Sequence, residues 1–305
     1  MRVFVTGASG HIGSAVVAEL LEAGHQVVGL ARSDVSAAAL TTAGAEVHRG
    51  ALDDLDSLHQ GAASADGVIH LAFDNDFSDY AAAGAADLRA VETMGAALDG
   101  SGKPFVITSG TLVLALAAPG RVGTEEDVPD AAWPRIASEN ATIALAERGV
   151  RSSVVRLPPT VHSDLDHHGF IPRLIGIARD KGVSAYVGDG SNRWPAVHTL
   201  DAAHLYRLAV EAAPAGSRLH AVADEGVPFR DIAGVIGANL DGAVVSISTE
   251  EAHAHLGFLG AFAALDNPTS SAWTQEVLGW QPEHPALVPD LEAGHYFGVS
   301  PRRSG

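Results

Sequence analysis

Residues 3–13 read Val-Phe-Val-Thr-Gly-Ala-Ser-Gly-His-Ile-Gly, and this stretch decides the fold of the chain. An apolar strand runs into three glycines, and apolar residues then recur at helical spacing in Ile12, Val16 and Leu20. Glycines at this spacing let the backbone turn tightly and approach a pyrophosphate, which the free N–H groups of the helix N-terminus attract. The alternative is an ordinary turn between a strand and a helix. The order of strand, glycines and helix favours a dinucleotide site.

Strand-like and helix-like segments alternate through about residue 157. This alternation predicts an α/β fold, a Rossmann-type doubly wound parallel sheet with helices on both faces. We expect residues 1–157 to form the dinucleotide-binding domain. Residues 158–305 are less regular, and we expect a smaller C-terminal part that covers the substrate and can return segments to the sheet. The strand-like segments are 2–6, 26–31, 45–49, 67–72, 104–109 and 152–157, and the helix-like segments are 11–23, 35–43, 54–62, 79–99 and 134–148.

Composition narrows the partners and the compartment of the protein. With a net charge of −18, the chain is not expected to bind nucleic acid or an anionic membrane surface. The absence of cysteine excludes disulfides, a thiol nucleophile and a thiolate metal site. The first strand begins at once and no apolar run reaches the length of a membrane span. We therefore expect a cytoplasmic protein without a signal peptide.

The form Thr-Gly-x-x-Gly-x-x-Gly of residues 6–13 resembles the short-chain dehydrogenase/reductase superfamily, and within it the extended and atypical branches related to nucleotide-sugar epimerases. Later segments resemble landmarks of that family in the same order, so the resemblance covers nearly the whole chain. It implies a nicotinamide dinucleotide cofactor, an adenine contact for Asp53 and a homodimer as the expected assembly. The landmarks are Asp53, the strands in 68–72 and 105–109, the substrate-domain signature in 188–193 with 197–201, and the C-terminal motif in 278–282.

The type of coenzyme depends on the end of the second strand. The position of the ribose-binding acid holds Ala31, and Arg32 and Ser33 follow it. Because an arginine there can pair with a 2′-phosphate, we expect NADP(H) to be preferred over NAD(H). Asp34 is interpreted as a cap or first-turn acid of the next helix. Motif and resemblance together assign the coenzyme site to Gly7, Ser9, Gly10, His11, Ile12, Gly13, Arg32, Ser33, Asp53, Leu71, Ala72, Phe73, Thr108 and Pro158.

Members of this superfamily ordinarily use a Tyr-x-x-x-Lys pair, in which the lysine lowers the tyrosine pKa and the phenol passes a proton to the carbonyl oxygen. Here no tyrosine has a lysine four residues later, and Arg135 and Glu139 fall nearest the two positions. The segment resembles an atypical subgroup with a His-x-x-x-Arg pattern, although Ala131 stands where the histidine would be. Arg135 can polarise an oxygen but cannot act as a general acid. The alternative for Arg135 and Glu139 is an i,i+4 pair on a helix surface.

Two hydroxyls and a histidine complete the candidate catalytic groups. Ser109 and Thr111 follow the fifth strand, where the family places the hydroxyl that orients the substrate carbonyl, although Gly110 is in closest register. His162 follows a segment that resembles the one beside the nicotinamide, and the usual pKa of histidine suits proton transfer. The candidate catalytic residues are therefore Ser109, Thr111, Arg135 and His162.

The C-terminal part holds the candidate substrate-binding residues. Arg193 and His198 lie in the substrate-domain signature and Trp194 lies between its two segments, and all three are predicted to bind substrate. For Arg193 and Trp194 the alternative is packing between the two parts. A cluster of acids and histidines follows the sixth strand, and we interpret it as a solvent-exposed loop rather than a metal site. Its members are His162, Asp164, Asp166, His167 and His168.

These observations favour an NADP(H)-dependent oxidoreductase that reduces a carbonyl, an imine or an activated alkene of a small organic substrate by hydride transfer. One alternative is a nucleotide-sugar epimerase or dehydratase, although the missing tyrosine argues against it. A second alternative is a protein that binds NADP(H) and senses redox state without turnover, because reactive pairs can be lost while a fold persists.

Overall fold

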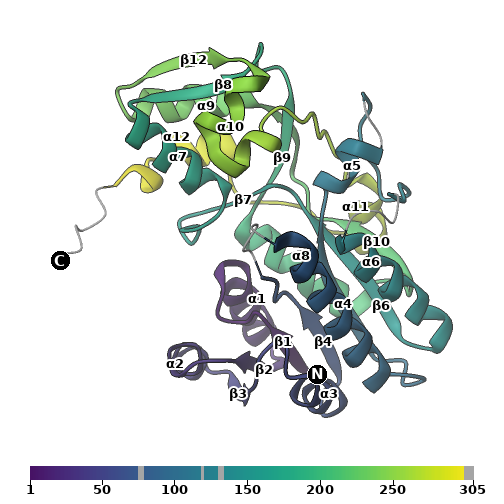
Figure 1. Cartoon of the computed structure of the whole chain (residues 1–305). Coiled ribbons are helices and arrows are strands. Elements are labelled where there is room, and N and C mark those ends of the chain that lie inside the picture. Colours follow the sequence, from purple (N-terminus) through teal and green to yellow (C-terminus); the bar gives the residue numbers. More distant parts are fainter. Residues whose placement is uncertain (75–78, 118–119, 130–133, 299–305) are drawn as a thin grey trace.

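The computed structural model describes residues 1–74, 79–117, 120–129 and 134–298. Figure 1 shows two parts, a large sheet with its covering helices and a smaller part drawn in teal, green and yellow. Within the described ranges, no helix is both long and apolar enough to cross a membrane.

One seven-stranded sheet forms the larger part, and all its neighbouring strands run parallel. This confirms the predicted doubly wound α/β fold. The central strands are apolar on both faces because helices cover both faces. In spatial order the strands are β3 (Glu46–Arg49), β2 (Gln26–Ala31), β1 (Arg2–Thr6), β4 (Gly67–His70), β5 (Pro104–Gly110), β6 (Arg151–Leu157) and β10 (Ser217–His220).

Two separate apolar cores lie on the two faces of this sheet. Val5, Val16 and Tyr206 belong to the first core, beside helices α1 (His11–Glu22), α2 (Asp34–Ala43) and α8 (Thr199–Ala212). Phe4 and Met94 belong to the second, which lies beneath α3 (Leu55–Ala63), α4 (Tyr80–Ala97) and α6 (Pro134–Ala144), the last continued by η2 (Leu145–Arg148). Successive strand residues such as Phe4 and Val5 therefore serve opposite cores.

A third core, which includes Trp194 and Phe229, organises the smaller part. Its strands form one three-stranded and one two-stranded sheet, β11-β9-β7 and β12-β8. The strands are β7 (Thr160–His162), β8 (Val183–Val187), β9 (Arg193–His198), β11 (Asp224–Pro228) and β12 (Ala243–Ile247). The helices are α7 (Phe170–Lys181), α9 (Phe229–Asn239), α10 (Thr249–Leu256), η3 (Gly257–Ala261), α12 (Leu287–Glu292) and η4 (His295–Phe297), while α5 (Leu112–Ala117) and α11 (Ala272–Leu278) lie nearer the large sheet.

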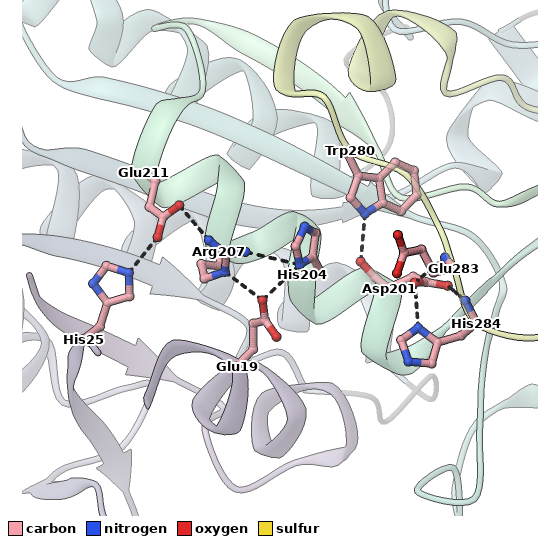
Figure 2. A network of polar contacts seen from close by, with 9 residues as sticks. All are labelled: Glu19, His25, Asp201, His204, Arg207, Glu211, Trp280, Glu283 and His284. Carbon is pink, nitrogen blue, oxygen red and sulfur yellow. Dashed lines mark hydrogen bonds and ion pairs between the residues drawn. The ribbon is translucent and has the colours of Figure 1, made fainter. Parts of the chain in front are cut away.

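The large sheet is not built from residues 1–157 alone, because two later segments return to it. Strand β10 pairs with β6, and helix α8 packs beside α1. Figure 2 shows that α8 carries polar contacts in two directions. Toward α1, Arg207 and His204 both contact Glu19 (2.7 and 3.0 Å). Toward the C-terminal segment, the Asp201 carboxylate accepts a hydrogen bond from His284 Nδ1 (2.7 Å), which ties that segment to the sheet.

His220, the last residue of β10, is enclosed where this returning strand meets the C-terminal segment. Its Nδ1 donates to the Ser270 carbonyl (2.7 Å), and Arg156 Nη1 lies 3.3 Å from its Nε2. Burial lowers the pKa of His220 to about 4, because a charged imidazole loses its hydration there. The folded protein therefore holds this histidine neutral.

We predict that His220→Gln removes part of the acid sensitivity of folding. A folded-state pKa below the unfolded value of 6.5 means that stability is full above pH 6.5 and is lost as the pH falls toward 4. In the wild-type protein, His220 should therefore lower the free energy of unfolding by roughly 2 kcal/mol when the pH falls from 7.5 to 5. Urea unfolding at both pH values should show a smaller difference in His220→Gln. The exposed His59→Gln should keep the wild-type difference, and equal differences in all three proteins would contradict the prediction.

Candidate active site

The loop between β1 and α1 has no space for side chains at its glycine positions, and its backbone is open to a ligand. Gly7 has a φ of +68°, which favours glycine, and its carbonyl accepts a hydrogen bond from Gly10 N (3.0 Å). A Cβ at Gly13 would lie 2.0 Å from Gly7 O. Among the described residues no side chain caps α1, so its first N–H groups are left for an anion. The loop therefore fits the diphosphate of a dinucleotide.

His11 contacts both helix α8 and the smaller part. Its Nε2 lies 2.8 Å from Oγ1 of Thr199, the first residue of α8, and its Nδ1 lies 3.7 Å from Oδ1 of Asp166 in the smaller part. Asp166 is buried and also accepts from the Tyr296 hydroxyl (3.3 Å). Burial lowers the pKa of His11, and the Asp166 charge opposes that shift. The glycine loop and the smaller part are thus joined at the first residue of α1, while Ser9 is exposed.

At the carboxyl end of β2, Arg32 is exposed and Ser33 caps α2 by accepting from Ser36 N (3.1 Å). Asp34 begins α2 and pairs with Arg49 (2.6 Å), so the first-turn interpretation of Asp34 is confirmed. Arg49 was not predicted from the sequence as a residue of this edge. The register of β2 with β3 sets Ala31 opposite Arg49, which brings a second arginine to this edge.

The loop after β4 runs against the glycine loop. A Cβ at Gly7 would lie 2.7 Å from the Ala72 nitrogen, and that nitrogen donates to Thr6 Oγ1 (3.2 Å). Leu71, Ala72 and Phe73 are half-buried, as residues lining a cleft can be. Thr108 turns its hydroxyl toward α8, where it lies 2.7 Å from the Tyr206 hydroxyl.

Other residues predicted for the coenzyme differ in their exposure. Ile12 packs partly buried against the first core, and Pro158 is buried directly after β6. Asp53 is exposed beyond β3, and Asp54 beside it caps α3. Their coenzyme contacts stay predictions.

Arg135, on α6, lies close to α4 and to the loop after β4. Its Nη2 donates to the Thr108 carbonyl (2.9 Å), and its guanidinium lies 4.0 Å above the centre of the Phe73 ring. Asp87 Oδ1 is 3.9 Å from the same nitrogen and 3.2 Å from His70 Nε2. Burial would raise the pKa of Asp87, but His70 and the Arg135 charge outweigh it and leave that pKa lowered. A fixed cation therefore stands beside the end of β5.

Glu139 belongs to a different network, so the interpretation of Arg135 and Glu139 as a helix-surface pair is wrong. The Glu139 carboxylate binds the Arg156 guanidinium through two hydrogen bonds (3.1 and 2.8 Å) and also accepts from Arg218 Nε (3.3 Å). Glu139 and Arg156 are both fully buried. Burial would raise the pKa of Glu139, and the arginines together with the Ser109 hydroxyl lower it.

Ser109 and Thr111 are both enclosed by protein in this conformation. Ser109 stands opposite Arg156 in the β5–β6 register and faces the Glu139 carboxylate. Thr111 accepts from Asn267 Nδ2 (3.0 Å) in the C-terminal segment. Both side chains are nearly inaccessible, so their predicted substrate contacts gain no support from the geometry.

His162 is enclosed in the smaller part. Its Nδ1 lies 2.8 Å from Asp290 Oδ2, and no described residue bonds to its buried Nε2. Its ring meets that of His198 edge-on at 5.5 Å, and His198 stacks on His284 at 4.7 Å. Burial and the neighbouring histidines lower the pKa of His198.

The acidic and histidine-rich loop after β7 is only partly exposed. Asp164, His167 and His168 are exposed as expected, whereas His162 and Asp166 are buried, so the interpretation as a solvent-exposed loop is wrong for these two. Within the described ranges, no three histidine, aspartate or glutamate side chains are arranged to hold a metal ion.

The other predicted substrate residues lie in packed surroundings. Trp194 is fully buried, and its ring meets the Phe229 ring edge-on at 4.8 Å. Arg193 pairs with Asp266 (2.8 Å). This geometry favours packing, which was the alternative for both residues, and their substrate contacts stay predictions.

Comparison with known proteins agrees with the fold and the glycine loop. The model of the NAD dependent epimerase/dehydratase family matches residues 3–222. An uncharacterized protein of Schizosaccharomyces pombe is 53% identical over 97% of this chain and 100% of its own length, and another of Saccharomyces cerevisiae is 44% identical over 97% and 99%. A ketoreductase of a farnesylated dihydroquinoline oxide from Stigmatella aurantiaca is 28% identical over 71% of this chain and 66% of its own.

Solved structures share the fold at low identity. A dTDP-glucose 4,6-dehydratase from Streptomyces venezuelae with NAD bound has a TM-score of 0.77 and 19% identity, covering 97% of this chain and 96% of that one. A UDP-glucose 4-epimerase from Thermus thermophilus in complex with NAD has a TM-score of 0.74 and 18% identity, covering 98% and 100%.

We predict that Gly13→Ala abolishes tight dinucleotide binding and lowers the thermal stability. The new Cβ would overlap the Gly7 carbonyl, and relieving the overlap must move the loop that faces the diphosphate. Calorimetric titration with NADPH and a thermal melt measure both effects. Gly176→Ala in α7, where a Cβ meets nothing within 4 Å, should bind normally and gain up to about 1 kcal/mol. Normal NADPH affinity in Gly13→Ala would contradict the prediction.

Proposed function

This chain belongs to the NAD dependent epimerase/dehydratase family, and we propose that it is an NADP(H)-dependent oxidoreductase that reduces the carbonyl group of a small organic substrate. The family and the NAD bound to the two fold neighbours support a nicotinamide dinucleotide as cofactor. The similarity to a protein named as a ketoreductase supports carbonyl reduction over other chemistries. The reduced nicotinamide supplies a hydride when it is bound.

The observation that carries the proposal is the cation at the position of the missing tyrosine. Arg135 is fixed by the Thr108 carbonyl, the Phe73 ring and the Asp87 carboxylate. An arginine keeps its proton near neutral pH, so it cannot serve as the base that oxidises a sugar hydroxyl. A fixed cation does stabilise the negative charge that develops on a carbonyl oxygen during reduction. Arg135 therefore suits reduction of a carbonyl better than sugar epimerisation or dehydration.

Arg135 acts by position in this proposal. Its side chain is 15% exposed, so most of its surroundings are protein and its field is weakly screened. Nη2 is engaged by the Thr108 carbonyl, and Nε has no acceptor among the described residues. The remaining N–H donors of the guanidinium are the groups that would contact the substrate oxygen.

The edge of the sheet at β2 and β3 supports the proposed preference for NADP(H). Arg32 is exposed there, and Arg49 stands opposite Ala31 in the strand register. Asp34 is the one acid in this group, and its pairing with Arg49 neutralises it. Net positive charge at this edge favours a 2′-phosphate over a hydroxyl.

Turnover tests the proposed function directly. The purified full-length protein should consume NADPH, followed by its absorbance, with at least one member of a panel of aldehydes, ketones and imines. Arg135→Gln should lower kcat about 100-fold, because it removes a charge-assisted contact to the developing oxyanion. Arg89→Gln, which changes an exposed arginine on α4, should leave kcat unchanged. Tight NADPH binding without turnover of any panel member would instead support the redox sensor.

We predict that Arg32→Ala selectively weakens NADPH. A charge-assisted contact to phosphate is worth about 1.5–3 kcal/mol, so the Kd for NADPH should rise roughly 10- to 100-fold. The Kd for NADH should change less than about threefold, because NADH lacks the 2′-phosphate. Fluorescence titration of both coenzymes measures the ratio. An equal loss for both coenzymes would show that Arg32 acts on the loop in general and would overturn the preference.

A further inference from the structure

Carbonyl reduction needs a proton for the oxygen, and the candidate catalytic residues predicted from the sequence do not supply it. Arg135 stays charged near neutral pH. The Ser109 and Thr111 side chains are almost completely buried, and the Thr111 hydroxyl accepts from Asn267. His162 is fully enclosed in the smaller part, where it contacts Asp290. A further acid is therefore required beside Arg135.

Besides Tyr80, the chain has three tyrosines, which lie on α8, β8 and η4. Tyr206 is fully buried in the first core against Thr108. Tyr296 accepts from Ser163 N (3.0 Å) and contacts Asp166, and Tyr186 lies on β8 in the two-stranded sheet. Burial raises the pKa of Tyr206 and the nearby Arg135 charge lowers it, but this phenol is fully buried and therefore out of reach of a substrate.

Tyr80, the first residue of α4, lies beside the Arg135 cluster. Its ring meets the Phe73 ring edge-on, with the ring centres 5.7 Å apart. The same Phe73 ring lies under the Arg135 guanidinium at 4.0 Å. Tyr80 is half-buried, and it begins a helix whose Asp87, two turns further on, holds Arg135. A phenol, an aromatic ring and a fixed cation thus stand together near the loop after β4.

We propose that Tyr80 donates the proton to the substrate oxygen and so takes the role of the missing tyrosine. The inference rests on the proposed carbonyl reduction. In this proposal the acid comes from a different helix, because Tyr80 lies on α4 whereas the tyrosine position of the family lies on α6. Arg135, on α6, then serves as the neighbouring cation that a lysine would otherwise provide.

The surroundings of Tyr80 suit a phenol that is neutral before proton transfer and whose phenolate then lies near the Arg135 guanidinium. Burial raises the pKa of Tyr80, the Arg135 charge lowers it, and the Asp87 charge raises it. The phenol is therefore protonated at neutral pH, ready to give its proton. After transfer, the phenolate stands near a guanidinium, which stabilises its charge.

A hydride would leave the bound reduced nicotinamide with the electron pair of its C–H bond, which oxidises the nicotinamide, and would form a new C–H bond at the carbonyl carbon. The π pair of the C=O bond would then move to the oxygen. The oxygen takes the Tyr80 proton, which leaves an alcohol and a phenolate beside Arg135. Because Tyr80 is only half-buried, water can return the proton to the phenolate.

The test compares Tyr80→Phe with Tyr186→Phe in the full-length protein, using the carbonyl substrate that the panel identifies. Tyr80→Phe should lower kcat about 100-fold, within the range for loss of a general acid, with the NADPH Kd changed less than about threefold. Tyr186→Phe should behave as wild type. If Tyr80→Phe keeps kcat within about threefold of wild type, the role of Tyr80 is overturned while the proposed reductase function stands. If wild-type protein reduces nothing, both fail.

A second measurement needs neither coenzyme nor substrate. The ultraviolet absorbance of phenolate, followed in a pH titration, isolates Tyr80 when the curve of Tyr80→Phe is subtracted from that of wild type. Removing the neighbouring cation with Arg135→Gln should raise the pKa of Tyr80, because phenolate loses its stabilising charge. Arg89→Gln should leave it unchanged. An identical Tyr80 titration in Arg135→Gln and wild type would overturn the proposed pairing of phenol and guanidinium.

Discussion

Close contact of bare backbone around Gly7 is the constraint on which the rest of the structure depends. A Cβ at Gly13 would lie 2.0 Å from the Gly7 carbonyl, and a Cβ at Gly7 would lie 2.7 Å from the Ala72 nitrogen. Strand β1, helix α1 and the end of β4 therefore meet without a side chain between them. This contact sets the direction of the α1 N-terminus. It also sets the path after β4, so that Phe73 emerges beside Arg135 and Tyr80.

The smaller part is attached to this centre through polar contacts as well as through the first apolar core, which includes Val197 of β9. His11 contacts Thr199 and Asp166, and Asp201 contacts the segment that contains His284. The first contact lies on the glycine loop itself. A diphosphate held by that loop would add negative charge next to His11, whose pKa is lowered by burial and raised by Asp166. Ligand binding and the seating of the smaller part therefore act on the same side chain.

The sequence predicts the parts of the structure that depend on local pattern. Apolar periodicity and the glycine spacing predict strands such as 2–6 and 26–31 with their observed bounds. These patterns depend only on residues that are close together in the sequence. Side-chain partners far apart in the chain have no such local signal. The link between Glu139 and Arg156 depends on the packing of α6 against β6, and spacing alone instead pairs Glu139 with Arg135. The same holds for Arg49, which only strand register brings opposite Ala31.

The absence of the family's lysine has a cause in this buried charge pairing. Position 139 lies between Arg156 and Arg218, which donate to its carboxylate. A lysine there would place a third positive charge in a fully buried site and leave Arg156 without a partner, a cost of several kcal/mol. A glutamate satisfies both arginines instead. The scaffold thus disfavours a lysine at position 139, and in the proposed mechanism the cation is Arg135, four residues earlier. The proposed acid, Tyr80 on α4, then stands beside that cation instead of beside a lysine.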